Sequence, residues 1–103
     1  MPATQITVIA YLTVQPGTEQ GFLDRFAAIV AQTRAEPGCI NYDFHRSATT
    51  PHCFVFYENY VDQAAFDRHL TQPYIVAWVE YAQLHGATFT VEYWQMISTP
   101  ARA

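Results

Sequence analysis

The sequence contains no lysine, because all five of its basic residues are arginine. This absence excludes mechanisms that need a lysine Schiff base, including pyridoxal phosphate chemistry, and it excludes the lysine of a phosphate-binding P-loop. Basic residues are also outnumbered, since nine Asp and Glu against five Arg give a formal net charge of -4. Such a chain lacks the basic surface typical of nucleic-acid-binding proteins, so we expect no nucleic-acid partner.

Glycine and cysteine are scarce as well. The four glycines form none of the Gly-rich motifs of nucleotide-binding proteins or α/β-hydrolases. The two cysteines, Cys39 and Cys53, lack C-x-x-C spacing and are too few for a disulfide framework or an iron–sulfur cluster. We therefore expect two free thiols, no cofactor and a reducing, cytoplasmic location.

Long apolar runs are missing too, since no stretch approaches the roughly 18 apolar residues that a membrane-spanning helix needs. No basic segment followed by an apolar run opens the chain, so the sequence predicts neither a signal peptide nor a membrane span. What it does contain is aromatic residues, at 16% of the total. With 103 residues, the chain is long enough for one domain, which we expect to span residues 1–103.

Two halves of the chain repeat one pattern, in which a strand is followed by a helix and a second strand. Alternation and β-branched residues predict strands over residues 5–14, 39–45, 53–60 and 88–97. Helical spacing, with Asp62 as an N-cap and Pro73 as a breaker, predicts helices over residues 18–36, 62–70 and 74–84. This βαββαβ order is typical of the ferredoxin-like α+β fold, whose four-stranded antiparallel sheet carries helices on one face.

The first predicted strand is apolar on both of its faces. Ile6, Val8 and Leu12 alternate with Ile9 and Tyr11, and the last predicted strand shows a similar pattern. The helices can cover only one face of the sheet, and an apolar second face would exceed the patch that a soluble monomer usually exposes. We therefore expect a homodimer in which the two sheets pack against each other.

One of the four histidines differs from the others in its surroundings. No pair of histidines has the spacing of a zinc motif, so we expect no metal site. Helical spacing places His69 beside Phe66, near the apolar stripe, where burial disfavours the charged imidazole and leaves a neutral base. The alternative is a histidine at the edge of the core that bonds to a backbone carbonyl.

The strand over residues 53–60 contains a carboxylate among aromatic residues. Burying Glu58 is costly unless it is paired, and an Arg, a Tyr hydroxyl or His69 could be its partner. Glu58 is either a structural anchor or a catalytic group. The seven Tyr and two Trp residues either line a cavity for a flat ligand or fill a dimer interface.

Four segments, in their order and spacing, resemble the antibiotic biosynthesis monooxygenase (ABM) family, and the likeness extends over roughly residues 6–96. The segments are Val14-Gln15-Pro16-Gly17, Glu36-Pro37-Gly38-Cys39-Ile40-Asn41-Tyr42, Phe54-Val55-Phe56-Tyr57-Glu58-Asn59-Tyr60 and Asp62-Gln63-Ala64-Ala65-Phe66, the last leading to His69. The resemblance implies a dimeric α+β barrel. It also implies oxygenation of quinols or polycyclic phenols by O₂ without metal or flavin, the substrate supplying the electrons.

The resemblance also implies roles for individual residues. His69 and Glu58 fall on a recurrent histidine and glutamate of the family and become the expected catalytic residues. Where relatives often have a second histidine, this sequence has Tyr74, which could donate a hydrogen bond to a substrate oxygen. The residues expected to bind the substrate are Tyr11, Asn41, Tyr57, Tyr74 and Trp78.

Two other functions stay open at this point. The dimer could bind an aromatic ligand without converting it, or it could isomerise a small metabolite with the same base. Relatives that degrade haem carry an Asn where this sequence has Ala10, which argues against that reaction.

Overall fold

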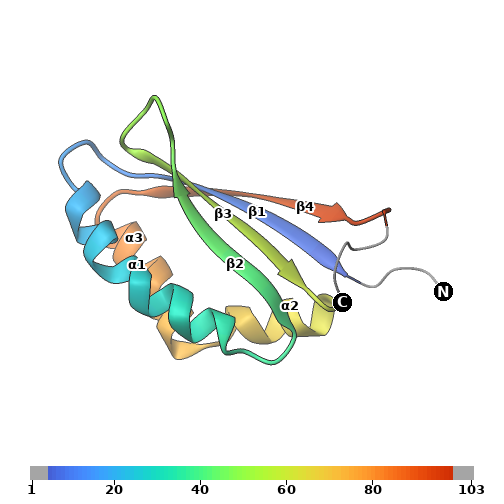
Figure 1. The fold of residues 1–103 in the computed structure, drawn as a ribbon. Coiled ribbons are helices and arrows are strands. Elements are labelled where there is room, and N and C mark those ends of the chain that lie inside the picture. Colours follow the sequence, from blue (N-terminus) through green and yellow to red (C-terminus); the bar gives the residue numbers. More distant parts are fainter. Residues whose placement is uncertain (1–4, 99–103) are drawn as a thin grey trace.

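The computed structural model describes residues 5–98, and its elements follow the predicted order (Figure 1). The strands are β1 (Ile6–Thr13), β2 (Cys39–Arg46), β3 (Cys53–Tyr60) and β4 (Thr88–Gln95). The helices are α1 (Glu19–Arg34), α2 (Gln63–Leu70) and α3 (Pro73–Leu84). The predicted βαββαβ pattern is therefore confirmed, with the second helical segment divided into α2 and α3.

Local chemistry sets the ends of these elements. The Asp62 side chain accepts a hydrogen bond from the Ala65 N–H at 2.9 Å, which confirms the predicted cap of α2. Helix α1 ends at Arg34, before the predicted end near Glu36, because a residue that precedes a proline avoids the helical conformation. Strand β4 ends before the predicted residue 97, at Gln95, which pairs with the first residue of β1.

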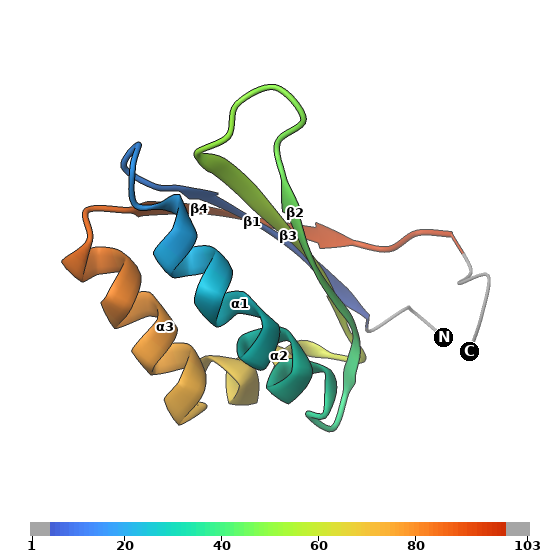
Figure 2. The same ribbon diagram turned by 60° about the vertical axis from the view of Figure 1, so that its left-hand side comes forward.

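The four strands form one antiparallel sheet in the order β2-β3-β1-β4, and all three helices lie on the same face of it (Figures 1 and 2). The core lies between this face and the helices. Alternation along the strands sends Val8, Ala10 and Leu12 of β1 and Phe54 and Phe56 of β3 into it. The ferredoxin-like α+β fold expected from the sequence is thus the fold of the chain.

No helix of the described residues covers the other face of the sheet, which we call the open face (Figure 1). The alternate residues of the strands lie there, among them Tyr11, Tyr57 and Trp94, which are 42%, 45% and 56% exposed. A polar network runs beside them, in which Asn59 bonds to Thr7 and Asn41. The open face therefore combines exposed aromatic rings with paired amides.

Cys39 and Cys53 are both free, as the sequence predicts. They lie at opposite ends of β3 in the sheet, because Cys39 pairs with Tyr60 and Cys53 pairs with Thr13. Burial raises the pKa of the Cys39 thiol from 9.0 to about 11, so this thiol stays protonated and weakly reactive. No helix in residues 5–98 is long and apolar enough to cross a membrane.

A tight turn joins α1 to β2 and packs against α2. Gly38 has a φ of +88°, which favours glycine, and its carbonyl accepts a hydrogen bond from the Val61 N–H at 2.8 Å. A Cβ at this position would lie 2.6 Å from the Ala65 Cβ of α2. The turn therefore needs glycine for two independent reasons, backbone conformation and space.

We predict that Gly38→Ala lowers the free energy of unfolding by about 2–4 kcal/mol, because it adds a clash to the cost of a left-handed alanine. Gly17→Ala is the matched control, since Gly17 also has a positive φ, +98°, but no atom lies within 4 Å of an added Cβ. The control should lose only about 1–2 kcal/mol. Urea denaturation measures both values, and equal losses would contradict the packing argument.

Candidate active site

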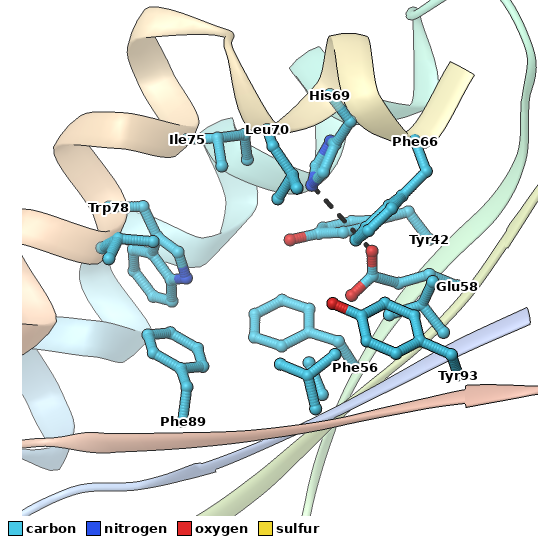
Figure 3. Close-up of a pocket in the computed structure, with 14 residues that line it drawn as sticks. Tyr42, Phe56, Glu58, Phe66, His69, Leu70, Ile75, Trp78, Phe89 and Tyr93 are labelled. Carbon is cyan, nitrogen blue, oxygen red and sulfur yellow. Dashed lines mark ion pairs between the residues drawn. The ribbon is translucent and has the colours of Figure 1, made fainter. Parts of the chain in front are cut away.

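A cavity of about 190 Å³ lies between the helix-covered face of the sheet and helices α2 and α3 (Figure 3). Its walls are mainly apolar and aromatic. The side chains with polar atoms that line it are Tyr42, Glu58, His69, Trp78 and Tyr93, and neither of the cationic residue types, Arg or Lys, is among the lining residues. The cavity is therefore suited to a flat ligand without negative charge.

His69 reaches this cavity from α2 and is only 4% exposed. Ala65, Phe66 and His69 share the inward face of the helix at i, i+1 and i+4 spacing. Aromatic rings surround the imidazole, with centroids 5.4 Å away for Tyr42 and Tyr60 and 6.0 Å for Phe66. Burial among these rings lowers the pKa of His69, and the Glu36 carboxylate partly offsets this effect. Burial therefore favours the neutral form of the imidazole.

Glu36, in the turn after α1, fixes the orientation of His69. His69 Nδ1 lies 3.2 and 3.1 Å from the two carboxylate oxygens of Glu36. The same carboxylate accepts a hydrogen bond from the Tyr74 hydroxyl of α3. Because a carboxylate can only accept, Nδ1 carries the proton and the Nε2 lone pair is left free. The bond expected to a backbone carbonyl, if His69 were merely structural, is replaced by one to a carboxylate.

Nε2 of His69 lies 3.9 Å from Oε1 of Glu58, and the dashed line in Figure 3 marks this pair. Glu58 is 4% exposed and accepts a hydrogen bond from the Tyr60 hydroxyl at 2.7 Å. Burial raises the pKa of the Glu58 carboxyl from 4.5 to about 7, although the bond from Tyr60 acts in the opposite direction. Near neutral pH the cavity thus holds a neutral base beside a carboxyl that readily gains or loses a proton.

The structure brings only some of the predicted site residues together. His69, Glu58 and Trp78 line the cavity. Tyr74 does not line it, because its hydroxyl is directed to Glu36 and lies 3.2 Å from the Gln32 carbonyl oxygen. Within residues 5–98, no group of three or more His, Cys, Asp or Glu side chains is placed to hold a metal ion.

Three further residues expected to bind the substrate, Tyr11, Asn41 and Tyr57, lie on the open face and not in the cavity. Their strand positions explain this correction, because each alternates with a neighbour that points toward the helices. The Asn41 amide is also occupied, since it donates to the Tyr57 carbonyl at 3.2 Å. The aromatic residues of the chain thus divide between two surfaces, the cavity and the open face.

Sequence reasoning missed Glu36 as part of the site. It lies 33 residues before His69 and outside any periodic pattern, so only the turn at Gly38 brings the two together. Phe66 was expected beside the imidazole from helical spacing, whereas Tyr42 and Tyr60 were missed as its neighbours. The alternation of β2 and β3 and the helical spacing of α2 contain the signal that places them on the inner face.

Comparison with known proteins adds the family. Residues 5–81 match the family model described as "Antibiotic biosynthesis monooxygenase" (ABM). The chain belongs to this family. The resemblance noted in the sequence is thereby confirmed, and the ABM region includes β1 to α3 apart from the last residues of that helix.

Individual relatives share part of this sequence. The chain is 33% identical over 75 residues to "Uncharacterized protein sll1783" of Synechocystis, a match that covers 73% of this chain and 51% of that protein. It therefore spans about half the length of that relative. It is also 33% identical over 64 residues to "Putative monooxygenase YcnE" of Bacillus subtilis, covering 62% of this chain and 67% of that protein.

Among solved structures, PA3566 from Pseudomonas aeruginosa superposes with a TM-score of 0.85 at 26% identity. That match covers 95% of this chain and 99% of the other. The ABM fold is therefore shared over nearly the whole length of both proteins.

We predict that the Glu58 carboxyl makes the protein less stable as the pH rises. Its pKa is 4.5 as an ordinary carboxyl and about 7 in the folded chain, so the folded chain binds this proton more tightly than the unfolded chain does. The resulting stabilisation of the fold is lost as the pH rises from about 4.5 to about 7. Glu58→Gln cannot ionise, so relative to wild type it should gain up to about 3 kcal/mol between about pH 4.5 and pH 8. Urea denaturation at both pH values measures this.

His69 acts in the opposite direction, since its lowered pKa makes the folded chain resist protonation and lose stability as the pH falls below 6.5. Both proteins retain His69, so the difference between wild type and Glu58→Gln reports the Glu58 carboxyl together with its interaction with His69. A difference that does not change with pH would contradict the raised pKa of Glu58.

Proposed function

We propose that this ABM-family protein is a cofactor-independent monooxygenase that acts on a quinol or a related phenol. The observation that carries the proposal is the position of His69, held by Glu36 so that its Nε2 faces a partly open, mainly aromatic cavity. The family and the printed name of the Bacillus subtilis relative support oxygen chemistry. His69 is the proposed base and Glu58 its proposed partner.

The reaction begins with the transfer of a phenolic proton to Nε2 of His69. The resulting phenolate is electron-rich and reduces O₂, while Glu36 and Glu58 stabilise the imidazolium from its two sides. The apolar walls exclude water and protect the intermediates. For a quinol the balance is one O₂ consumed, one oxygen atom added to the ring, the other released as water, and a hydroxyquinone formed.

The cavity favours a compact, neutral substrate over a polycyclic one. An engineered cavity of roughly 150 Å³ holds a benzene molecule, so about 190 Å³ accommodates a substituted ring system of one or two rings. A carboxylate or phosphate substrate would meet Glu58 without a compensating cation, because no Arg or Lys lines the cavity. Among the substrates implied by the family, a small quinol fits this space best.

We predict that metal-stripped protein consumes O₂ in the presence of a small quinol faster than the quinol autoxidises. His69→Ala should lower turnover by about 10²- to 10⁴-fold, the usual contribution of a general base. The rate of the wild type should rise with pH as His69 loses its proton, with a midpoint below 6.5 because burial lowers the pKa of this imidazole. An oxygen electrode and product analysis by mass spectrometry measure both effects.

His85→Ala is the matched control, because His85 is exposed at the end of α3 and outside the cavity. It should keep wild-type turnover. Glu36→Gln keeps an acceptor for Nδ1 but removes the charge, so its turnover should lie between those of the wild type and His69→Ala. Full activity of folded His69→Ala would show that His69 is not the base. Product without O₂ uptake would indicate an isomerase, and binding without product an aromatic-ligand carrier.

We further propose that the protein is a homodimer formed through the open face. This face carries Tyr11, Tyr57 and Trp94 exposed on one continuous sheet surface, which a second sheet could cover. The polar groups between them are already paired, as in the bond from Asn59 to Asn41 at 2.9 Å. Covering the face therefore removes apolar surface from water and leaves few polar groups without partners.

Sedimentation at micromolar concentration should accordingly give about twice the chain mass of 11.7 kDa. Tyr57→Glu should shift the protein toward monomer, because it places a charge at the centre of the proposed interface. Leu84→Glu is the control, since Leu84 is 82% exposed but lies on α3, away from the sheet. A wild-type monomer at this concentration would refute the dimer.

A further inference from the structure

Trp78 carries a buried hydrogen-bond donor that nothing in the described chain satisfies. Its side chain is only 4% exposed, and its indole Nε1 has no hydrogen-bond partner within residues 5–98. Buried donors are paired in the great majority of cases, and an orphan marks a place where a partner is missing. The missing partner of Trp78 is the starting point for assigning one end of the cavity.

The indole nitrogen faces into the cavity, on the side opposite His69 and Glu58 (Figure 3). The indole packs against apolar rings, with the centroid of Phe22 at 5.6 Å and that of Phe56 at 6.2 Å, both edge to face. Aromatic faces are weak acceptors compared with an oxygen atom. Within residues 5–98 the protein therefore supplies no acceptor to this N–H.

We infer that Trp78 Nε1–H donates a hydrogen bond to the second oxygen of the substrate, while the first oxygen lies at His69. The inference rests on the proposed function, since that function places a phenolic hydroxyl at Nε2 of His69. The two contacts lie on opposite sides of the cavity, so they call for a ring with oxygens at positions 1 and 4, which point away from each other. A ring with oxygens at positions 1 and 2 places both on one side.

This donor adds no step to the reaction, but it matches the charge that the reaction develops. As a 1,4-quinol is oxidised, its second oxygen changes from a hydroxyl to a carbonyl, which is the better acceptor. A fixed donor aimed at that atom stabilises the oxidised form more than the reduced one. Trp78 is thus a specificity residue that selects for the distance between two oxygens.

Binding of two probes tests the inference under anaerobic conditions, where no turnover occurs. The probes are 1,4-dihydroxybenzene and 4-methylphenol, which have similar size but differ in the second oxygen. In the ¹⁵N-labelled full chain, the indole N–H signal of Trp78 should move downfield with the diol and stay nearly unchanged with 4-methylphenol. Trp94 is an internal control, because it lies on the open face with its N–H 3.3 Å from a Glu92 oxygen.

Trp78→Phe keeps an aromatic ring but removes the donor together with part of the ring volume, and it also assigns the Trp78 signal by its disappearance. Because the lost volume affects both probes, the variant should weaken binding of 1,4-dihydroxybenzene about 3- to 10-fold more than binding of 4-methylphenol. Equal losses for the two probes, or a diol that binds without moving the Trp78 signal, would overturn the inference.

If the variant does not fold, the inference can be tested on the wild type alone, which should bind the 1,4-diol more tightly than the 1,2-diol. Equal affinities for these isomers, or no binding of any probe, would also overturn the inference. Measuring oxygen consumption distinguishes a failure of this inference from a failure of the proposed function. A shifted Trp78 signal without O₂ uptake would support the Trp78 contact with the ligand and contradict the proposed monooxygenase activity.

Discussion

The hydrogen bond between Glu36 and His69 is the contact on which the rest of the site depends. The carboxylate follows α1, the imidazole belongs to α2, and the Tyr74 hydroxyl that bonds to the same carboxylate belongs to α3. One side chain thereby joins all three helices above the sheet. The bond also determines which imidazole nitrogen holds the proton. The same contact therefore packs the helix layer and sets the tautomer of His69.

The two-residue period of the strands divides the aromatic residues of this chain between two surfaces. On β3, Phe56 and Glu58 face the cavity while Tyr57 faces the open side of the sheet. On β1, Ala10 faces the cavity while Tyr11 does not. A shift of pairing by one residue would exchange the two surfaces, so the candidate site requires the antiparallel register as much as it requires the side chains that line the cavity.

Periodicity was sufficient to predict the strands, the break at Pro73 and the inward position of His69, because these follow from neighbours in sequence. It was also sufficient to identify Glu58 as a buried carboxylate needing a partner, and the structure supplies both the Tyr hydroxyl and the imidazole. Glu36 could not be predicted, since its role depends on a turn that packs against a helix far along the chain. Tyr11 and Tyr57 do not line the cavity, and the strand alternation that sets Tyr11 opposite Val8 and Leu12 in the sequence already contained this signal.

The break between α2 and α3 separates two kinds of residue that a continuous helix would combine. His69 lies before the break, whereas Ile75 and Trp78, which shape the far end of the cavity, lie after Pro73. Substitutions in α3 can therefore reshape the space for a ligand without moving the base along its helix. A short interruption in one chain segment in this way lets the position of His69 and the shape of the far end of the cavity vary separately.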